Sequence, residues 1–252
     1  MRWIFLRGLI REKRHWGNFP EVFAKSFSIP SEQILSLDLP GIGTERGRIF
    51  PSSMTALVED VRARSGIIPG EKIGIFSMSL GSMCALGWAS SYPDEIGGVV
   101  LVNTSAADLS SWNQRLTWVA LKAFGQVLQV ADPFEREKVI LKLGSNMKGD
   151  DAEIARYWAS FAPKKAELLP LAAKQLWVAA RFRAPAQLKV PCLILSSTGD
   201  RLANPSCSAL LAKRYGVENH VHLKAGHDLG LDDPEWVIQR TSEWKGRYLR
   251  HS

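Results

Sequence analysis

Hydrophobic residues gather in short runs along the chain, and segments with helical spacing separate these runs. Buried strands of a parallel sheet have this mostly unbroken apolar character, because helices cover both faces of the sheet. Between two runs, Met54, Leu57, Val58 and Val61 recur at helical spacing and predict a helix that ends near Gly66. Such alternation predicts an α/β fold with a doubly wound, mostly parallel sheet. The predicted strands are Trp3–Leu6, Ile34–Leu37, Ile73–Phe76, Val99–Val102, Cys192–Leu195 and Val221–Leu223.

The alternation stops between residues 106 and 189, where the sequence becomes helical and rich in tryptophan. Proline and glycine divide this segment into several short helices rather than one long helix. We therefore expect a helical cap or lid at 106–189, inserted between two parts of one α/β core at 1–105 and 190–252. The dividing residues are Asp132-Pro133, Gly144, Gly149-Asp150, Pro163 and Pro170.

Composition narrows the class of protein. The chain has 252 residues, 46% of them hydrophobic and 23% charged, which excludes long disorder and a small disulfide-stapled scaffold. No run approaches the roughly 20 apolar residues that a membrane-spanning helix needs. The first apolar run is interrupted by Arg7 and lacks a small-residue cleavage site, so we interpret it as a strand and not a signal peptide.

Three cysteines, Cys84, Cys192 and Cys207, are an odd number and have no metal-ligand spacing. This pattern predicts reduced thiols and a cytoplasmic location, and no spacing in the chain implies a metal or a cofactor. The net charge of +7 is partly concentrated in the first 14 residues. Since no nucleic-acid-binding motif accompanies these residues, we interpret them as a solvated surface and expect neither a nucleic-acid partner nor integral membrane association.

Ser79 occupies the most informative position for chemistry. The segment Ile73–Ala85 runs from a predicted strand directly into a helix of small residues, and Ser79 lies at the turn. Such a sharp turn requires small residues two positions away on either side, which Ser77 and Gly81 supply. Ser79 is thus a candidate nucleophile, and the helix N-terminus favours negative charge that develops beside it.

A serine nucleophile requires a base, and the base requires an acid that holds its tautomer. Among the five histidines, His227 follows the last predicted strand, whereas His15, His220, His222 and His251 are interpreted as surface or packing residues. Asp200 follows the strand that begins at Cys192, and Asp108 is a rival acid. The carboxyl ends of parallel strands meet at one edge of a sheet, so Ser79, Asp200 and His227 are expected together there.

With these residues the chain resembles the α/β-hydrolase superfamily, whose Ser, Asp, His order matches Ser79, Asp200 and His227. Phe5-Leu6-Arg7-Gly8-Leu9 resembles the third strand and oxyanion turn of that family, so the resemblance implies a fold that lacks the first two strands of larger members. Residues 36–43, Ser-Leu-Asp-Leu-Pro-Gly-Ile-Gly, are similar to the next strand and its D-x-P-G-x-G turn. By resemblance, the backbone N–H groups of Leu9 and Leu80 form the oxyanion hole.

Two residues depart from the family pattern. Ser77 stands where the family usually has glycine, and Arg7 stands where it usually has histidine. Ser77 is small enough for the turn, whereas Arg7 places a long cation beside the oxyanion turn and is expected to influence substrate preference. Neither departure removes a catalytic group.

The resulting hypothesis is a serine hydrolase that cleaves a small-molecule carboxylic ester or thioester through an acyl-enzyme on Ser79. A second hypothesis keeps the same triad for acyl transfer or for C–C bond hydrolysis. A third is a non-catalytic binding protein on the hydrolase fold. Aromatic residues of the expected cap are candidates either for an apolar acyl pocket or for the core of the cap itself. They include Phe124, Phe134, Phe161 and Phe182.

Overall fold

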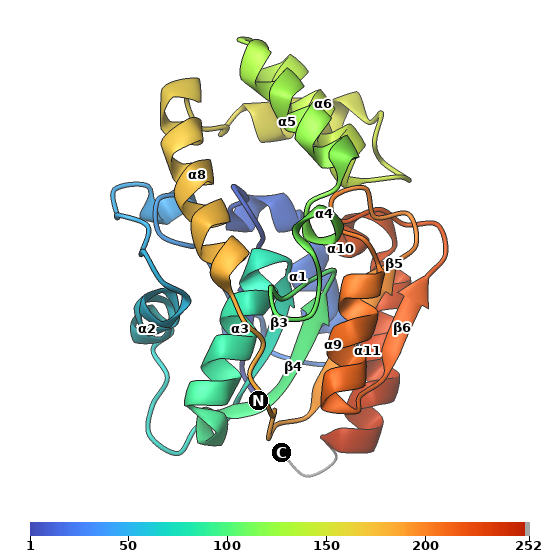
Figure 1. Ribbon diagram of the computed structural model, residues 1–252. Helices are drawn as coiled ribbons and strands as arrows, with labels where there is room; N and C mark the ends of the chain where they lie inside the picture. Colours follow the sequence, from blue (N-terminus) through green and yellow to red (C-terminus); the bar gives the residue numbers. More distant parts are fainter. Residues whose placement is uncertain (250–252) are drawn as a thin grey trace.

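The computed structural model describes residues 1–249 and contains a six-stranded parallel sheet with the order β2-β1-β3-β4-β5-β6 (Figure 1). The prediction of an α/β fold with a parallel sheet is confirmed. The strands are β1 (Trp3–Leu6), β2 (Ile34–Leu37), β3 (Ile73–Met78), β4 (Ile96–Val102), β5 (Cys192–Ser197) and β6 (Asn219–His222).

The last strand begins two residues earlier and ends one residue earlier than predicted. Pairing with β5 places Ser197 opposite His222, and Leu223 lies beyond the strand with 78% of its surface exposed. The predicted Val221–Leu223 was therefore wrong at both ends, because cross-strand pairing, and not the apolar character of Leu223, sets the limits of this edge strand.

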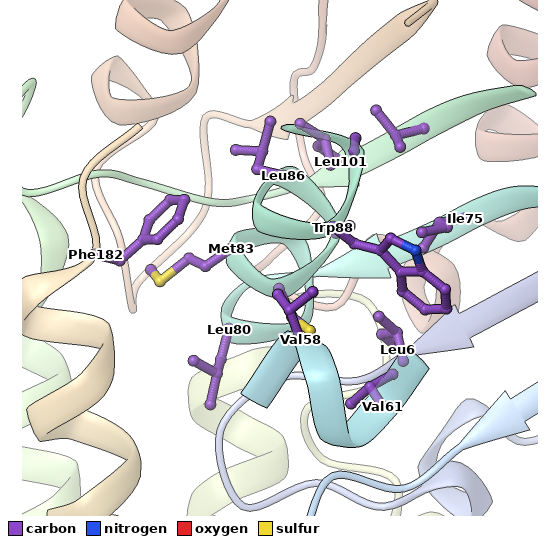
Figure 2. Close-up of a cluster of buried hydrophobic side chains, with 14 of the residues drawn as sticks. Leu6, Val58, Val61, Ile75, Leu80, Met83, Leu86, Trp88, Leu101 and Phe182 are labelled. Atoms are coloured by element: carbon purple, nitrogen blue, oxygen red, sulfur yellow. The ribbon is translucent and has the colours of Figure 1, made fainter. Parts of the chain in front are cut away.

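Helices cover both faces of the sheet, and alternate strand residues contribute to two separate cores. One core lies between the sheet and helices α2 (Met54–Arg64), α3 (Leu80–Ser91) and α9 (Ser206–Tyr215). Figure 2 shows part of it, where Val58 and Val61 of α2 and Trp88 of α3 pack near Leu6 and Ile75 of the sheet. The other core lies against helices α1 (Phe19–Ser26) and α11 (Pro234–Tyr248). The doubly wound arrangement follows from this covering of both faces.

The segment between β4 and β5 is helical, as expected, and lies over the carboxyl edge of the sheet (Figure 1). Two small apolar clusters hold its helices together, with Leu141 and Trp158 in one and Ala120 and Leu143 in the other. Its helices are α4 (Trp112–Arg115), α5 (Trp118–Gln129), α6 (Pro133–Gly144), α7 (Ala152–Ala159) and α8 (Lys165–Arg181).

Pro170 was expected to separate two helices, but it lies inside α8. Proline removes one backbone donor, so the helix loses only the hydrogen bond to the carbonyl of Ala166, an exposed residue. Asp132 behaves as expected and begins α6, where its side chain accepts a hydrogen bond from the backbone N–H of Glu135.

The remaining helical elements of the described chain are all short. Helix α10 (Leu229–Asp232) follows the loop that carries His227, and four 3₁₀ turns complete the fold. These turns are η1 (Lys13–Trp16), η2 (Ser31–Gln33), η3 (Gly43–Glu45) and η4 (Pro93–Glu95). Among residues 1–249, each helix is too short or too polar to cross a membrane.

Candidate active site

Ser79 lies in the sharp turn between β3 and α3 and has a strained backbone. Its φ is 54° and its ψ is −117°, a conformation that non-glycine residues rarely adopt. The strand β4 and the residues after it hold both sides of this residue. Its N–H donates to the carbonyl of Val102 at 2.9 Å, and its carbonyl accepts from the Thr104 hydroxyl at 2.9 Å. Strain of this kind persists only where the surroundings over-determine it, and it is concentrated at functional sites.

Two glycines allow the close approach that this turn requires. A Cβ atom at Gly81 would lie 2.4 Å from the carbonyl oxygen of Leu6 and 2.6 Å from that of Arg7, so no larger residue fits. At Gly8, a Cβ atom would lie 3.0 Å from the Cβ of Ser79. The turn after β1 therefore packs directly against the candidate nucleophile.

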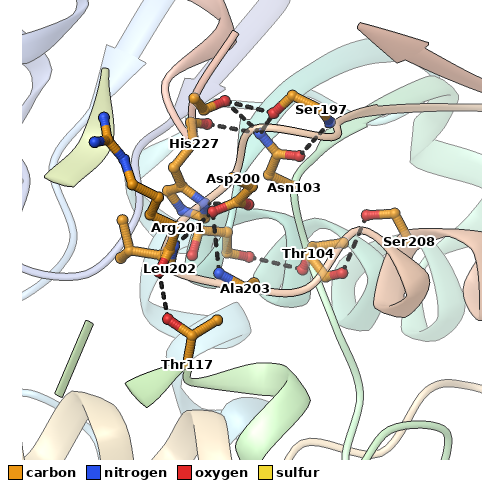
Figure 3. Close-up of polar contacts among 12 residues, drawn as sticks. Asn103, Thr104, Thr117, Ser197, Asp200, Arg201, Leu202, Ala203, Ser208 and His227 are labelled. Carbon is orange, nitrogen blue, oxygen red and sulfur yellow. Dashed lines mark hydrogen bonds and ion pairs between the residues drawn. The ribbon is translucent and has the colours of Figure 1, made fainter. Parts of the chain in front are cut away.

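His227 and Asp200 are joined by a buried hydrogen bond. The Nδ1 atom of His227 lies 2.7 Å from Oδ2 of Asp200, and only 7% and 1% of these two side chains are exposed (Figure 3). The other carboxylate oxygen of Asp200 accepts hydrogen bonds from the backbone N–H groups of Leu202 and Ala203 at 2.7 and 3.0 Å. Asp200 is thus fixed by its own loop and presents one oxygen to the imidazole.

Asn103 ties the loop of His227 to the sheet. Its Nδ2 atom donates to the carbonyl of His227 at 2.8 Å, and its Oδ1 atom accepts from the N–H of Ser197 at 3.1 Å (Figure 3). Asn103 has a positive φ of 45° and follows β4 directly. Sequence analysis missed both Asn103 and Thr104, although a polar pair directly after a buried strand was a usable signal. Together these two residues hold the backbones of His227 and Ser79.

The two expected oxyanion donors come from two segments that meet at Ser79. Leu9 belongs to the turn that packs on Ser79, and Leu80 is the first residue of α3. Within the described chain, neither N–H donates to an acceptor, so both remain free to bind an oxyanion. No hydrogen bond joins Ser79 to His227 in residues 1–249; such contacts commonly tighten when a substrate binds.

Ser79 and His227 both line a cavity of about 290 Å³ between the sheet and the 106–189 segment. Its far wall is apolar, mostly aliphatic with Phe124 and Trp158, and comes from helices α5, α6, α7 and α8. Phe124 lines the cavity, Phe134 packs inside the 106–189 segment, and Phe182 packs on the sheet core. Phe161 packs inside the segment and also against the ring of His15. The cavity wall includes Val127, Leu128, Ile140, Leu143, Leu168, Leu169, Ala172, Ala173 and Leu176.

The sequence of this protein matches the model of the alpha/beta hydrolase family over residues 4–240. The chain belongs to the alpha/beta hydrolase family. No curated protein sequence matches it significantly.

Solved structures show the same fold at low sequence identity. A meta-cleavage product hydrolase from Pseudomonas fluorescens IP01 superposes with a TM-score of 0.79 at 16% identity, over 98% of this chain and 91% of that one. An enol-lactonase from Burkholderia xenovorans LB400 has a TM-score of 0.72 at 19% identity, with 97% and 91% of the two chains covered. The esterase RhEst1 from Rhodococcus sp. ECU1013 has a TM-score of 0.73 at 14% identity, with 98% and 91% covered.

The two departures from the hydrolase pattern are both accommodated inside the protein. Ser77 is fully buried, and its hydroxyl donates to the carbonyl of Val100 at 3.0 Å. Arg7 forms a buried ion pair with Asp228, at 2.6 and 3.2 Å between their nitrogen and oxygen atoms, and its guanidinium lies 4.5 Å from the Trp16 ring centroid. The charge of Arg7 is therefore neutralised beside the site, and its pairing joins the turn after β1 to the loop of His227.

Substitution of Arg7 by alanine is expected to lower the free energy of unfolding by about 3–5 kcal/mol. The physical reason is that Asp228, only 4% exposed, would retain a buried charge without its partner. Urea denaturation measures this loss. Lys142→Ala, which removes an ion pair that is 66% and 88% exposed, serves as the control and should change stability little. A loss for Arg7→Ala no larger than that of the control would contradict the prediction.

The rival acid and the other histidines of the described chain lie outside the cavity wall. Asp108 accepts a hydrogen bond from the N–H of Ala184 and pairs with Arg214 at 2.6 Å, which fixes the end of the 106–189 segment. His220 contacts Glu218 and His222 contacts Asp233. His251 lies outside the described residues. The three cysteines are buried and free, and burial raises the pKa of the Cys84 thiol to about 12.

His15 lies in a buried polar network that joins the core to the 106–189 segment. Its ring contacts Arg11, which pairs with Glu137 of α6 at 2.8 Å and lies 5.0 Å from the Trp158 ring centroid. Because Arg11 can only donate, the facing Nε2 atom of His15 must accept, which places the ring proton on Nδ1, near the carbonyl of Glu12. Burial, followed by the charge of Arg11, holds the pKa of His15 well below its usual range.

Acidification is therefore expected to destabilise the protein through His15. The unfolded chain takes up a proton near the ordinary histidine pKa of about 6.5, whereas the folded protein does not, so stability is lost as the pH falls below that value. The slope from this group approaches about 1.4 kcal/mol per pH unit. Urea denaturation from pH 7 to pH 5 measures it, and His15→Gln, which keeps an acceptor without a titrating proton, should flatten the slope. An unchanged slope in that variant would overturn this assignment.

Proposed function

We propose that this protein is a serine hydrolase that cleaves a carboxylic ester or thioester with Ser79, His227 and Asp200. The observation that carries the proposal is the buried pair of His227 and Asp200, which shares one cavity with Ser79 in its strained turn. A binding protein has no need of a strained serine, a buried imidazole–carboxylate pair and two free N–H groups around one cavity. Membership of the hydrolase family supports the same conclusion.

The proposed reaction has two steps. Ser79 Oγ attacks the substrate carbonyl while Nε2 of His227 takes its proton, and the resulting imidazolium is stabilised by Asp200. The C–O or C–S bond then breaks, and the proton on His227 passes to the leaving alkoxide or thiolate. In the second step, water loses a proton to His227 and attacks the acyl-enzyme, and Ser79 leaves with that proton. The products are a carboxylic acid and an alcohol or thiol.

Charge on the carbonyl oxygen is expected to be stabilised by the N–H groups of Leu9 and Leu80. In a site shielded from water, fixed donors of this kind contribute strongly, since removal of one such donor typically costs 10²–10³-fold in rate. The N-terminal end of the twelve-residue helix α3 adds a favourable dipole at the same place.

The cavity supports an apolar acyl group of small to medium size. Its volume of about 290 Å³ lies at the lower end of the range for small-molecule sites, and aliphatic side chains of α5, α6 and α8 dominate its wall. These helices come from residues 106–189, which we assign as the cap that selects the acyl chain. The core parts at 1–105 and 190–252 would then carry the reacting groups.

The proposal is tested with a fluorophosphonate probe and with a panel of p-nitrophenyl esters from acetate to dodecanoate. Peptide mass spectrometry should find one adduct per chain, on Ser79, and heat-denatured protein should give none. In the ester panel, kcat/KM should rise about fourfold per added methylene until the cavity is full, in line with about 0.8 kcal/mol per buried methylene. Folded protein without an adduct would overturn the proposal and favour the binding protein.

A further inference from the structure

Helix α8 contacts the turn after β1, and the polar side chain of Gln175 lies in this contact. Gln175 is fully buried, with 0% of its surface exposed. It lies where two faces of α8 meet, because Ala172, one turn before it, lines the cavity, whereas Val178, one turn after it, packs in the sheet core. A polar group at this border, between an aliphatic wall and an apolar core, calls for an explanation.

The partner of Gln175 is the backbone next to an expected oxyanion donor. Its Oε1 atom accepts a hydrogen bond from the N–H of Ile10 at 2.8 Å. Ile10 has a φ of 54°, a conformation that is unfavourable for a β-branched residue. The turn is closed by one further backbone hydrogen bond, from the N–H of Arg11 to the carbonyl of Gly8 at 3.3 Å. Gln175 therefore holds the strained residue that directly follows Leu9.

The NH₂ group of the Gln175 amide is buried at a cost in free energy. Its Nε2 atom is buried and has no hydrogen-bond partner in the described chain. The amide cannot simply be reversed, because the N–H of Ile10 requires an oxygen opposite it. An aliphatic side chain of similar length would remove the unpaired Nε2 donor, but it would leave the N–H of Ile10 without its acceptor, so packing alone does not account for glutamine here. In the described chain, the hydrogen bond that Oε1 accepts from the N–H of Ile10 is the one favourable polar contact of this side chain.

We propose that Gln175 is a positioning residue, which sets the Leu9 N–H for the oxyanion by holding Ile10 from the cap. This inference rests on the proposed function. Since α8 also supplies Leu168, Leu169 and Leu176 to the cavity wall, the same helix that contacts the acyl group orders the oxyanion turn. A shift of α8 on the core would therefore change the position of the Leu9 N–H in the oxyanion hole.

The test compares Gln175→Met, which removes the acceptor at similar length, with Gln175→Glu, which keeps an acceptor oxygen. Rates of fluorophosphonate labelling and kcat and KM for p-nitrophenyl hexanoate are measured for each. Gln175→Met should lower kcat and the labelling rate about 10- to 100-fold, less than the loss of a whole oxyanion donor, and should leave KM within about twofold. Affinity for a hexyl trifluoromethyl ketone, which forms a tetrahedral adduct, should fall by the same factor. Gln175→Glu should restore part of each loss.

Val178→Ala is the matched control, because it weakens the packing of α8 one turn away but keeps the Gln175 oxygen that accepts from the N–H of Ile10. It should lower the melting temperature more than Gln175→Met does, yet keep the labelling rate near that of the unmodified protein. If Gln175→Met labels at the unmodified rate, or raises KM with kcat unchanged, Gln175 has no positioning role. If the unmodified protein itself neither labels nor hydrolyses esters, the proposed function fails, and this role fails with it.

Discussion

Replacement of Ser79 by alanine is expected to lower kcat about 10⁶-fold and to abolish the fluorophosphonate adduct. The loss is this large because, in the proposed mechanism, the Ser79 hydroxyl forms the acyl-enzyme and is the nucleophile that His227 and Asp200 activate. The measurement is burst and steady-state hydrolysis of p-nitrophenyl hexanoate, together with intact mass after treatment with the probe.

The fold of the Ser79→Ala variant should be preserved, because its backbone contacts to Val102 and Thr104 do not involve the hydroxyl. Ser90→Ala, at an exposed position of the same helix, is the control for loss of a serine and should behave like the unmodified protein. Hydrolysis by Ser79→Ala within tenfold of the normal rate would show that another group carries the reaction.

Substitution of Asp200 by asparagine is expected to lower kcat about 10⁴-fold while the fold is preserved. Two backbone N–H groups, of Leu202 and Ala203, donate to one oxygen of Asp200, so the amide oxygen of asparagine must take that place. Its NH₂ group then faces Nδ1 of His227 and forces that atom to accept a hydrogen bond. The ring proton moves to Nε2, the atom that receives the proton of Ser79 in the proposed reaction.

Two measurements separate this tautomer effect from unfolding. The pH dependence of single-turnover acylation reports the effect on the reaction, and urea denaturation reports the stability of the variant. Asp108→Asn is the matched control, since Asp108 is the other acid considered for this role and it pairs with Arg214, away from the cavity. It should retain kcat within a few-fold. Equal losses of kcat in the two variants would remove Asp200 from the proposed triad.

Local sequence patterns were sufficient for the order of elements and for the loops that carry the candidate residues. Strands buried on both faces must be apolar throughout, so β1, β3, β4 and β5 were visible as runs. The edge strand β6 was misplaced, because it is partly exposed and its limits depend on pairing with β5. Pro170 was misread for a related reason: a proline near the start of a helix costs one hydrogen bond, which α8 tolerates.

Residues that support the candidate site were harder to predict. Arg7 and Asp228 are 221 positions apart, and Gln175 and Ile10 are 165 apart. Neither periodicity nor motif spacing contains information about such pairs, since each partner taken alone looks like an ordinary polar residue. The influence of Arg7 on substrate preference stays a prediction, since Arg7 and Asp228 both line the cavity. Their buried ion pair could not be predicted from the sequence.

The sequence by itself determined the parallel α/β fold, the turn that holds Ser79, and the chain order of Ser79, Asp200 and His227. These features follow from local physics: apolar runs that must be buried, small residues that a sharp turn requires, and strand ends that meet at one edge. Tertiary structure alone decided the largely apolar cavity, the pairing of Asp200 rather than Asp108 with His227, and the contact of Gln175 with the turn after β1. Those depend on which distant segments pack together, because burial and hydrogen-bond partners are properties of the assembled chain and not of neighbouring residues.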